Sequence, residues 1–217
     1  ELNNPLTGIR SLAQVLLQEI DAEKALHADL VEVEKAAERC QKIIENLLNF
    51  SKSKGDADSV LVSVNQVVSN TLPMLKTAMR EHRCEINLSE QDLFAKAPPQ
   101  LLQQVIFNLV NNACQAMIDP GTISISTHVN RSQGSDSQKD WVEIHVKDTG
   151  QGISPEILET IFEPFFTTKD PGQGTGLGLS MSLSIIKKLG GQIFVESVVG
   201  KGSHFIVQLP LAMGGCE

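Results

Sequence analysis

Two runs of apolar residues near the start of the chain are spaced alternately four and three residues apart. They are Leu2, Leu6, Ile9, Ala13, Leu16 and Ile20, followed by Leu26, Leu30, Val33, Ala37, Cys40, Ile44 and Leu47. This spacing is typical of helices packed in coiled coils and four-helix bundles. Only the short polar stretch 21–25 separates the runs, which predicts an antiparallel hairpin. A lone hairpin leaves half of its apolar stripe uncovered. The pattern therefore favours a homodimeric four-helix bundle over a hairpin packed on its own downstream domain.

The heptad pattern ends in the charged, polar segment 51–58, which is typical of a linker. Beyond it, helices and strands interleave without a regular βαβ repeat, so we predict an α+β fold with a largely antiparallel or mixed sheet. The expected helices are Asn65–His82, Gln100–Met117 and Leu177–Leu189, and the expected strands are Cys84–Leu88, Thr122–Val129, Trp141–Lys147, Gly191–Ser197 and Ser203–Leu209, with a loop at Arg131–Ser137. The predicted organisation is a hairpin domain at 1–53, a linker at 54–60, a second domain at 61–211 and a tail at 212–217.

Composition excludes several classes of protein. The 217 residues are 41% apolar and 20% charged, which fits a soluble globular chain. A net charge of −8 argues against direct nucleic-acid binding. The sequence has no run of the roughly 18 apolar residues that a membrane helix needs. The first residue is not Met, so we expect a fragment whose membrane contacts, if any, lie upstream. The four scattered cysteines, Cys40, Cys84, Cys114 and Cys216, predict reduced cytosolic thiols rather than a disulfide or zinc site.

A stripe of uncharged amides marks the helix expected at 100–117. Its members, Gln104, Asn108, Asn111, Asn112 and Gln115, fall on one face, and the rest of the helix is apolar. Amide oxygens can ligate Mg²⁺, and amide NH₂ groups can donate to phosphate. The stripe alone is equally compatible with a helix that has one solvated side.

Two glycine-rich segments are further candidates for ligand binding. Asp148-Thr-Gly-Gln-Gly-Ile153 follows a predicted strand, where its glycines allow a sharp turn and its carboxylate can accept a hydrogen bond from an amine. Alone it also describes an ordinary turn. Gly172-Gln-Gly-Thr-Gly-Leu-Gly-Leu-Ser180 enters a helix and predicts a phosphate cradle of backbone N–H groups. Because it follows no strand and has no G-x-x-x-x-G-K-[ST] match, a dinucleotide fold and a P-loop are both disfavoured.

In order, Asn108-x-x-x-Asn112, Asp148-Thr-Gly-Gln-Gly152, Phe162-Glu-Pro-Phe-Phe-Thr-Thr-Lys169, Gly174-Thr-Gly-Leu-Gly-Leu179 and Gly200-Lys-Gly202 resemble the N, G1, F, G2 and G3 boxes of two-component sensor histidine kinases. Glu1-Leu-Asn-Asn-Pro-Leu6 resembles an H box that lacks only its histidine. The resemblance covers residues 1–211. It implies a dimerisation and histidine-phosphotransfer hairpin, followed by a Bergerat-fold ATP-binding domain, and a phosphoacceptor histidine just before Glu1.

The resemblance also implies roles for individual residues in binding ATP and Mg²⁺. Asp148 would bind the adenine amine, and Asn112 with Asn108 would hold Mg²⁺. A mobile lid would run from Phe165 to Thr175, with Lys169 reaching phosphate. The nucleotide-contacting set is completed by Gln115, Gly150, Gly152, Ile153, Gly174, Thr175, Gly176, Leu177, Gly178 and Leu179. Many family members carry a phosphate-contacting Lys where this chain has Gln115, so affinity is expected to depend more on Lys169 and the lid.

The reaction that the resemblance implies is autophosphorylation, with Glu1, Asn4, Asn108 and Lys169 as the catalytic residues. Glu1 would accept the imidazole proton. The phosphoryl group would then pass to an aspartate of a response regulator, and Asn4 would position a water for dephosphorylating that regulator. We expect the kinase to be cytoplasmic, or the cytoplasmic part of a membrane-anchored receptor. The alternatives are a related ATPase and a nucleotide-binding dimer scaffold. Because Asn108 stands where such ATPases carry a glutamate base, hydrolysis is disfavoured.

Overall fold

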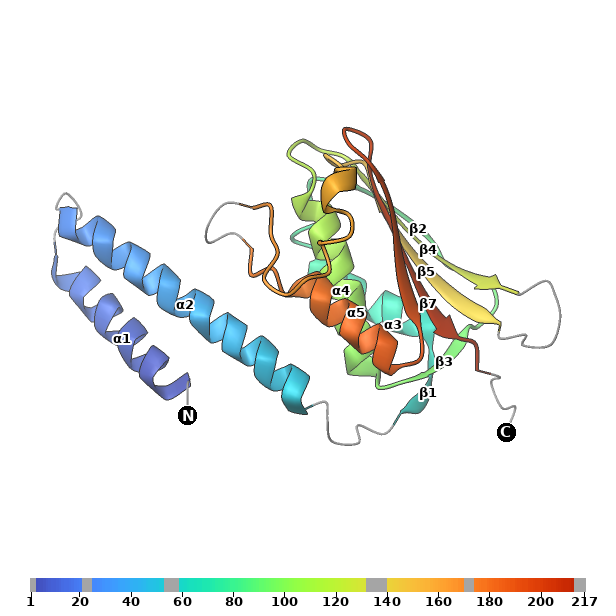
Figure 1. Ribbon diagram of the computed structural model, residues 1–217, viewed down its shortest axis with the longest axis horizontal. Helices are drawn as coiled ribbons and strands as arrows, with labels where there is room; N and C mark the ends of the chain where they lie inside the picture. Colours follow the sequence, from blue (N-terminus) through green and yellow to red (C-terminus); the bar gives the residue numbers. More distant parts are fainter. Residues whose placement is uncertain (1–2, 21–24, 53–58, 132–139, 170–173, 213–217) are drawn as a thin grey trace. The chain divides into compact units, whose positions relative to one another are not determined.

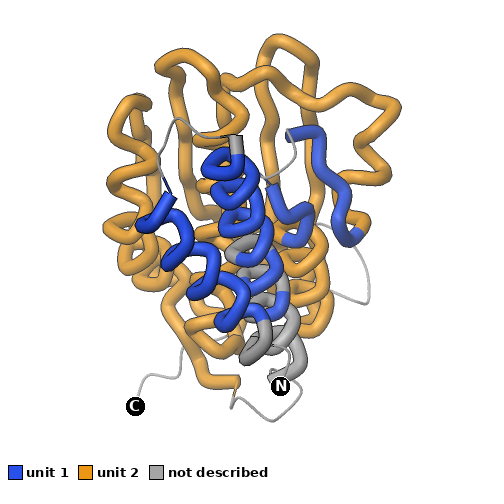
Figure 2. Tube along the Cα trace, turned by 90° about the vertical axis from the view of Figure 1, so that its left-hand side faces the viewer, with its two compact units in different colours: residues 1–56, 164–177 blue, residues 57–163, 178–217 orange. Residues whose placement is uncertain are grey.

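The computed structural model describes residues 3–20, 25–52, 59–131, 140–169 and 174–212. The chain forms two compact units (Figure 2). One comprises residues 1–56 and 164–177, and the other comprises residues 57–163 and 178–217. The segment 164–177, which lies within the predicted domain at 61–211, is part of the first unit. In the described ranges, no helix combines the length and the apolar character needed to cross a bilayer.

The predicted helical hairpin is confirmed. Helix α1 spans Asn3–Glu19 and α2 spans Ala25–Lys52. Ala13 and Ala37 are almost fully buried, which is consistent with close packing of the two helices. Polar side chains also join them: Arg10 Nε donates to Glu34 Oε1 over 3.0 Å. The small residues of the heptad runs thus lie within the hairpin.

Several larger residues of the predicted stripes are exposed on the hairpin. Ile9 and Leu16 on α1 retain 47% and 40% of their surface, and Val33 on α2 retains 46%. Leu12, Val15 and Leu26 are also exposed. A single copy of the hairpin therefore leaves a row of apolar surface in water, as expected for half of a bundle.

The second unit is built on a five-stranded mixed sheet with the strand order β2-β4-β5-β7-β6. Its strands are β2 (Arg83–Asn87), β4 (Thr122–Asn130), β5 (Trp141–Asp148), β6 (Gln192–Val198) and β7 (Gly202–Pro210). Only β2 and β4 run parallel, and every other pair in this sheet is antiparallel. The predicted α+β class and mixed sheet are confirmed.

Three helices of this unit lie on one face of the sheet (Figure 1). They are α3 (Val64–Thr71), α4 (Pro99–Gln115) and α5 (Gly178–Lys188). Alternate residues of the strands face them, so that on β5 the side chains of Val142, Ile144 and Val146 are buried. The core between the layers includes Val64, Val68, Leu102, Ile106, Leu109, Ile123, Ile125, Ile186, Val207 and Leu209.

Two sequence predictions about local structure were wrong. The helix expected at 65–82 ends at Thr71 and continues as the 3₁₀ helix η1 (Leu72–Leu75) and turns, because Pro73 supplies no backbone N–H for a continuing α-helix. The sequence analysis also missed the strands β1 (Val60–Ser63) and β3 (Phe94–Ala97), which pair as a separate two-stranded sheet. Because β1 begins at Val60, it enters the predicted linker at 54–60. Most of the loop expected at 131–137 lies outside the described residues.

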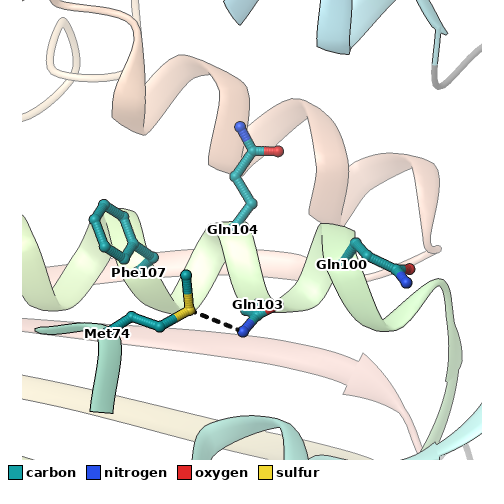
Figure 3. Close-up of a pocket in the computed structure, with 5 residues that line it drawn as sticks. All are labelled: Met74, Gln100, Gln103, Gln104 and Phe107. Atoms are coloured by element: carbon teal, nitrogen blue, oxygen red, sulfur yellow. Dashed lines mark hydrogen bonds between the residues drawn. The ribbon is translucent and has the colours of Figure 1, made fainter. Parts of the chain in front are cut away.

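A shallow hollow of about 250 Å³ lies on α4 beside η1. Met74, Gln100, Gln103, Gln104 and Phe107 line it (Figure 3), and Gln103 Nε2 lies 3.1 Å from the sulfur of Met74. Gln104, one member of the amide stripe, lies here, four residues or more from the other members along α4. The hollow is therefore distinct from the part of α4 that carries Asn108 and Asn112.

Candidate nucleotide-binding site

Asp148 is the last residue of β5 and continues its inward-facing row, so a carboxylate enters the edge of an apolar core. Its side chain is 2% exposed. Oδ1 accepts the backbone N–H of Gly150 at 2.8 Å and that of Ser203 at 3.2 Å. Burial raises the pKa of Asp148, while these two bonds act in the opposite direction. Among the described residues, Oδ2 has no hydrogen-bond partner, so it remains available to an amine.

The turn between β6 and β7 holds Asp148 from one side. Gly202 has a φ of +105°, and a Cβ there would lie 2.0 Å from the backbone oxygen of Asp148. Only glycine fits this approach, which brings the N–H of Ser203 within reach of the carboxylate. The Gly200–Gly202 segment therefore shapes the candidate site, although its sequence is also that of a plain hairpin turn.

The glycines that follow Asp148 pack against two other elements. A Cβ at Gly150 would lie 2.5 Å from the carbonyl oxygen of Ala116, just beyond α4. At Gly152, with φ +71°, it would lie 2.2 Å from the carbonyl oxygen of Val198. Ile153 is half-buried, and its N–H donates to Ser197 Oγ over 2.8 Å. The loop after β5 is thereby fixed between the end of α4 and the β6–β7 turn.

Asn108 joins α4 to the start of α5. Its Nδ2 donates to the carbonyl oxygen of Gly178 at 3.3 Å and to Ser182 Oγ at 3.4 Å. Ser182 Oγ in turn donates to the same carbonyl at 2.8 Å. The amide nitrogen is thus used in packing the two helices, and Oδ1 of Asn108 has no hydrogen bond among the described residues. Gly178 lies close to the Asn108 side chain: a Cβ at Gly178 would be 3.8 Å from Asn108 Cγ.

Asn112 lies one turn further along α4 and is half-buried. No described residue makes a hydrogen bond with its side chain, which is unusual for a half-buried amide. Two amide oxygens one turn apart are ligands of the type that Mg²⁺ accepts when phosphates and waters complete its coordination. Asn108 and Asn112 therefore fit a magnesium ion. Gln115 is exposed at the C-terminal end of α4.

The segment 164–177 belongs to the other unit and carries the remaining predicted residues. Phe165 has a φ of +68°, which is rare for a residue other than glycine, and its side chain is 59% exposed. Its N–H donates to the carbonyl oxygen of Gly176 over 3.0 Å. A Cβ at Gly176 would lie 2.4 Å from the backbone carbon of Phe165. Phe165 and Gly176 therefore lie in backbone contact at the two ends of the segment 166–175.

Within this segment, a Cβ at Gly174 would lie 2.7 Å from Thr167 Oγ1, which also accepts the N–H of Lys169 at 3.2 Å. Desolvation lowers the pKa of Lys169. Thr175 Oγ1 accepts the N–H of Leu177 at 3.4 Å, and Leu177 is buried. Leu179 is half-buried in the first turn of α5. Residues 170–173 of the predicted lid lie outside the described residues.

The structure brings Asp148, Gly150, Gly152 and Ile153 together in one loop, and places Asn108 beside Gly178. Glu1 lies outside the described residues, and Asn4 is placed only as a backbone position in α1. Sequence reasoning missed Ser203, which donates to Asp148, and Ser182, which bonds Asn108. Ser203 could have been inferred from its place directly after the last glycine of the Gly200–Gly202 turn. Ser182 carries no comparable signal.

Two family descriptions match the chain. "Histidine kinase-, DNA gyrase B-, and HSP90-like ATPase" matches residues 97–213, and "His Kinase A (phospho-acceptor) domain" matches residues 1–56. The chain belongs to the sensor histidine kinases of two-component systems, and its second unit carries the ATPase-like fold that they share with DNA gyrase B and HSP90.

Individual relatives agree with this family. The chain is 37% identical over 221 residues to the sensor kinase CckA of Brucella abortus (strain 2308), and 38% identical over 215 residues to the signal transduction histidine-protein kinase AtoS of Escherichia coli (strain K12). Each match covers 97% of this chain, but only 23% and 33% of those relatives. The chain thus spans a quarter to a third of their length.

Solved structures show the same fold. The catalytic domain of histidine kinase ThkA aligns with a TM-score of 0.58 at 31% identity, over 70% of this chain and 94% of that one. Full-length ShkA aligns with a TM-score of 0.71 at 20% identity, over 99% of this chain and 45% of that one. The first likeness covers a catalytic domain, and the second extends the fold to the helical part.

Proposed function

We propose that this chain is the catalytic core of a sensor histidine kinase, which binds ATP with Mg²⁺ and transfers the γ-phosphoryl group to a histidine immediately before Glu1. The observation that carries the proposal is the arrangement of Asp148. Its carboxylate is buried and held through Oδ1 by two backbone N–H groups, and Oδ2 has no hydrogen-bond partner in the described part of the chain. An adenine amine supplies the donor that this oxygen lacks. Gly150 and Gly152 let the loop after Asp148 pack closely against the carbonyl oxygens of Ala116 and Val198, which fixes that loop.

We assign the metal-binding role to Asn108 and Asn112. Mg²⁺ bound there would neutralise charge on the triphosphate. The hydrogen bonds of Asn108 to α5 use Nδ2, and among the described residues neither Asn108 Oδ1 nor the Asn112 side chain has a competing partner. Both amides are uncharged, so they add no repulsion toward phosphate.

The same amides favour a kinase over an ATPase. Hydrolysis needs a general base that takes a proton from water, and an amide has no usable basicity. The nitrogen of Asn108 is also engaged with Gly178 and Ser182. A site built in this way holds ATP for a nucleophile supplied from elsewhere, which we assign to the imidazole.

For the phosphates, we assign binding to residues from the F and G2 boxes. Lys169 supplies a cation, and its desolvated ammonium gains from an anionic partner. Gly174, Thr175, Gly176 and Leu177 lead into Gly178 and Leu179 at the start of α5. The first turn of a helix is a favourable place for an anion. Phe165 and Gly176 form the base of the lid. Gln115, at the end of α4, contributes a neutral donor.

The hairpin supplies the remaining partners. We propose that residues 1–53 form a homodimer through the exposed apolar row, and that the bundle docks the receiver domain of a response regulator, whose aspartate accepts the phosphoryl group. Glu1 accepts the imidazole proton, and Asn4 positions a water for dephosphorylating the regulator. If so, Asn4→Ala in a chain that includes the histidine retains autophosphorylation but slows decay of the phosphorylated regulator, and unchanged decay would refute this role.

A test of the nucleotide assignment uses the chain as it stands. We expect calorimetry to show one ATP bound per chain, dependent on Mg²⁺, while an assay of inorganic phosphate shows no sustained release. Repeated turnover to ADP and phosphate would identify an ATPase instead, and a failure to bind ATP would remove the basis of the proposal.

A further inference from the structure

Three histidines lie outside the nucleotide-binding site, on the face of the sheet opposite α3, α4 and α5. His128 lies on β4, His145 on β5 and His204 on β7. Each alternates with inward-facing core residues, so all three project from the opposite face. His145 lies edge-on to His128, with 5.0 Å between ring centroids, and stacks on His204 at 5.1 Å and 30°.

His145 and His204 face each other through one nitrogen each. The Nδ1 atom of His145 lies 2.9 Å from Nε2 of His204. The outer nitrogen of each ring has its own carboxylate: His145 Nε2 lies 2.9 Å from Glu143 Oε2, and His204 Nδ1 lies 3.6 Å from Glu196 Oε2. Two carboxylate–imidazole pairs therefore converge on one point between β5 and β7.

Glu143 is held firmly in this arrangement. Its Oε1 accepts Asn130 Nδ2 at 2.8 Å and Gln208 Nε2 at 2.7 Å. Although burial acts to raise it, the hydrogen bonds from Asn130, Gln208 and His145 keep the pKa of Glu143 below its ordinary value. The carboxylate therefore stays charged and fixes His145 with its Nε2 as the donor. Burial and the nearby His145 lower the pKa of His204, while Glu196 acts in the opposite direction.

We propose that His145 and His204 form a binding site for a divalent transition-metal ion of the zinc type, which imidazole nitrogen ligates. Histidines that bind metals usually donate their other ring N–H to a carboxylate. His145 has that partner in Glu143, and Glu196 lies 3.6 Å from the outer nitrogen of His204. Zn–N bonds of about 2.0–2.1 Å in tetrahedral geometry need nitrogens about 3.3 Å apart. To bind the ion, the rings have to separate by a few tenths of an ångström and turn, so that both lone pairs point at the metal instead of at each other.

The protein supplies two ligands in this site, and water completes the coordination. No group of three or more His, Cys, Asp or Glu side chains within the described ranges is arranged around a metal, so His128 is left outside the coordination. Without metal, a proton shared between the two facing nitrogens satisfies the same geometry. The proton and the metal ion then compete for one position.

The test titrates the reduced chain with Zn²⁺ alone, without nucleotide, by calorimetry. We expect one site per chain, with His145→Gln and His204→Gln each weakening binding by about tenfold or more. Glu143→Gln should weaken it by about tenfold, because His145 Nε2 loses the carboxylate that orients the ring. His27→Gln, on α2, is the matched control and should leave the affinity unchanged. Thermal melts of each variant check that it is folded.

Two further measurements use the wild-type chain and avoid dependence on a variant that fails to fold. Co²⁺ should give ligand-field bands without a thiolate-to-cobalt charge-transfer band, and the side-chain ¹⁵N resonances of His145 and His204 should shift on adding Zn²⁺. Absence of binding, binding that is unaffected in His145→Gln and His204→Gln, a thiolate band, or unmoved resonances would each overturn the proposal.

Discussion

The backbone N–H of Ser203 donates to Oδ1 of Asp148 over 3.2 Å, and so joins the start of β7 to the end of β5. The contact depends on Gly202, whose α-carbon lies against the backbone of Asp148. The carboxylate is thus oriented by main-chain groups, which leaves its second oxygen for a ligand. We propose that this arrangement sets the preference for adenine.

Asp148→Asn tests that preference. The amide oxygen can retain both backbone hydrogen bonds, but it presents an NH₂ group where Oδ2 lay. We expect ATP affinity to fall by roughly 10- to 100-fold, the value of a hydrogen bond to a charged group. ITP, which has an oxygen in place of the adenine amine, is the matched ligand. The wild type should prefer ATP to ITP by calorimetry, and a variant that keeps this preference would contradict the role of Asp148.

The same variant should alter how stability depends on pH. Burial raises the pKa of Asp148, so the folded state holds the proton more tightly than the unfolded state. As pH rises from the ordinary value of 3.8 through the raised folded value, the free energy of unfolding should therefore fall. Denaturant titrations should show this decline in the wild type and a smaller one in Asp148→Asn. Equal slopes would mean that the burial of the charge has no energetic effect.

Gly202 and Gly200 form a matched pair in one turn. Both have positive φ, but only at Gly202 would a Cβ meet backbone, whereas nothing lies within 4 Å of one at Gly200. Gly200→Ala should cost about 1 kcal/mol from φ alone. Gly202→Ala should cost about 3 kcal/mol or more and weaken ATP binding. Equal losses in chemical denaturation would show that the close approach to Asp148 is unimportant.

Asn112 and Asn108 should separate binding from stability. Asn112→Ala removes no hydrogen bond to a described residue, so we expect stability within about 0.5 kcal/mol of the wild type and loss of Mg²⁺-dependent ATP binding. Asn108→Ala also removes bonds to Gly178 and Ser182 and should cost about 1 kcal/mol. Calorimetry with and without EDTA, beside thermal melts, measures both effects. Mg²⁺-dependent binding that survives in Asn112→Ala would exclude it as a ligand.

The exposed apolar row on the hairpin predicts self-association. Charged residues in Ile9→Glu and Ile44→Glu should turn a dimer into a monomer, because charge at a bundle seam is costly to bury. Gln18→Glu, at an exposed position of α1, is the control and should remain dimeric. Light scattering at micromolar concentration distinguishes the two states. A wild-type chain that is monomeric would contradict the bundle.

Features with strong periodicity were predictable from the sequence. Apolar residues spaced alternately four and three apart predicted the hairpin. Apolar residues at every second position predicted the strands that carry Val142–Val146 and Phe205–Leu209. The alternation of apolar residues alone places Asp148 at a strand end. By contrast, β1 and β3 are four residues each, too short for a periodic signal to distinguish them from loops.

The missed parts of the candidate site depend on contacts between distant residues. Ser203 is 55 residues from Asp148, and Ser182 is 74 residues from Asn108, so neither pairing leaves a local pattern. Phe165, which has a positive φ, likewise packs against Gly176, 11 residues further along the chain, and its N–H donates to the carbonyl oxygen of Gly176. Sequence reasoning identified the chemical groups, whereas the structure shows which main-chain groups orient them.

The central claim is tested most directly with a chain extended upstream to include the proposed histidine. Incubated with γ-³²P-labelled ATP and Mg²⁺, it should acquire label that is stable in alkali and lost in acid, as expected for phosphohistidine. His→Gln at that position and Asn112→Ala should each abolish the label. A label that is stable in acid, as on Ser or Thr, would contradict the account. So would release of free phosphate without any labelled protein.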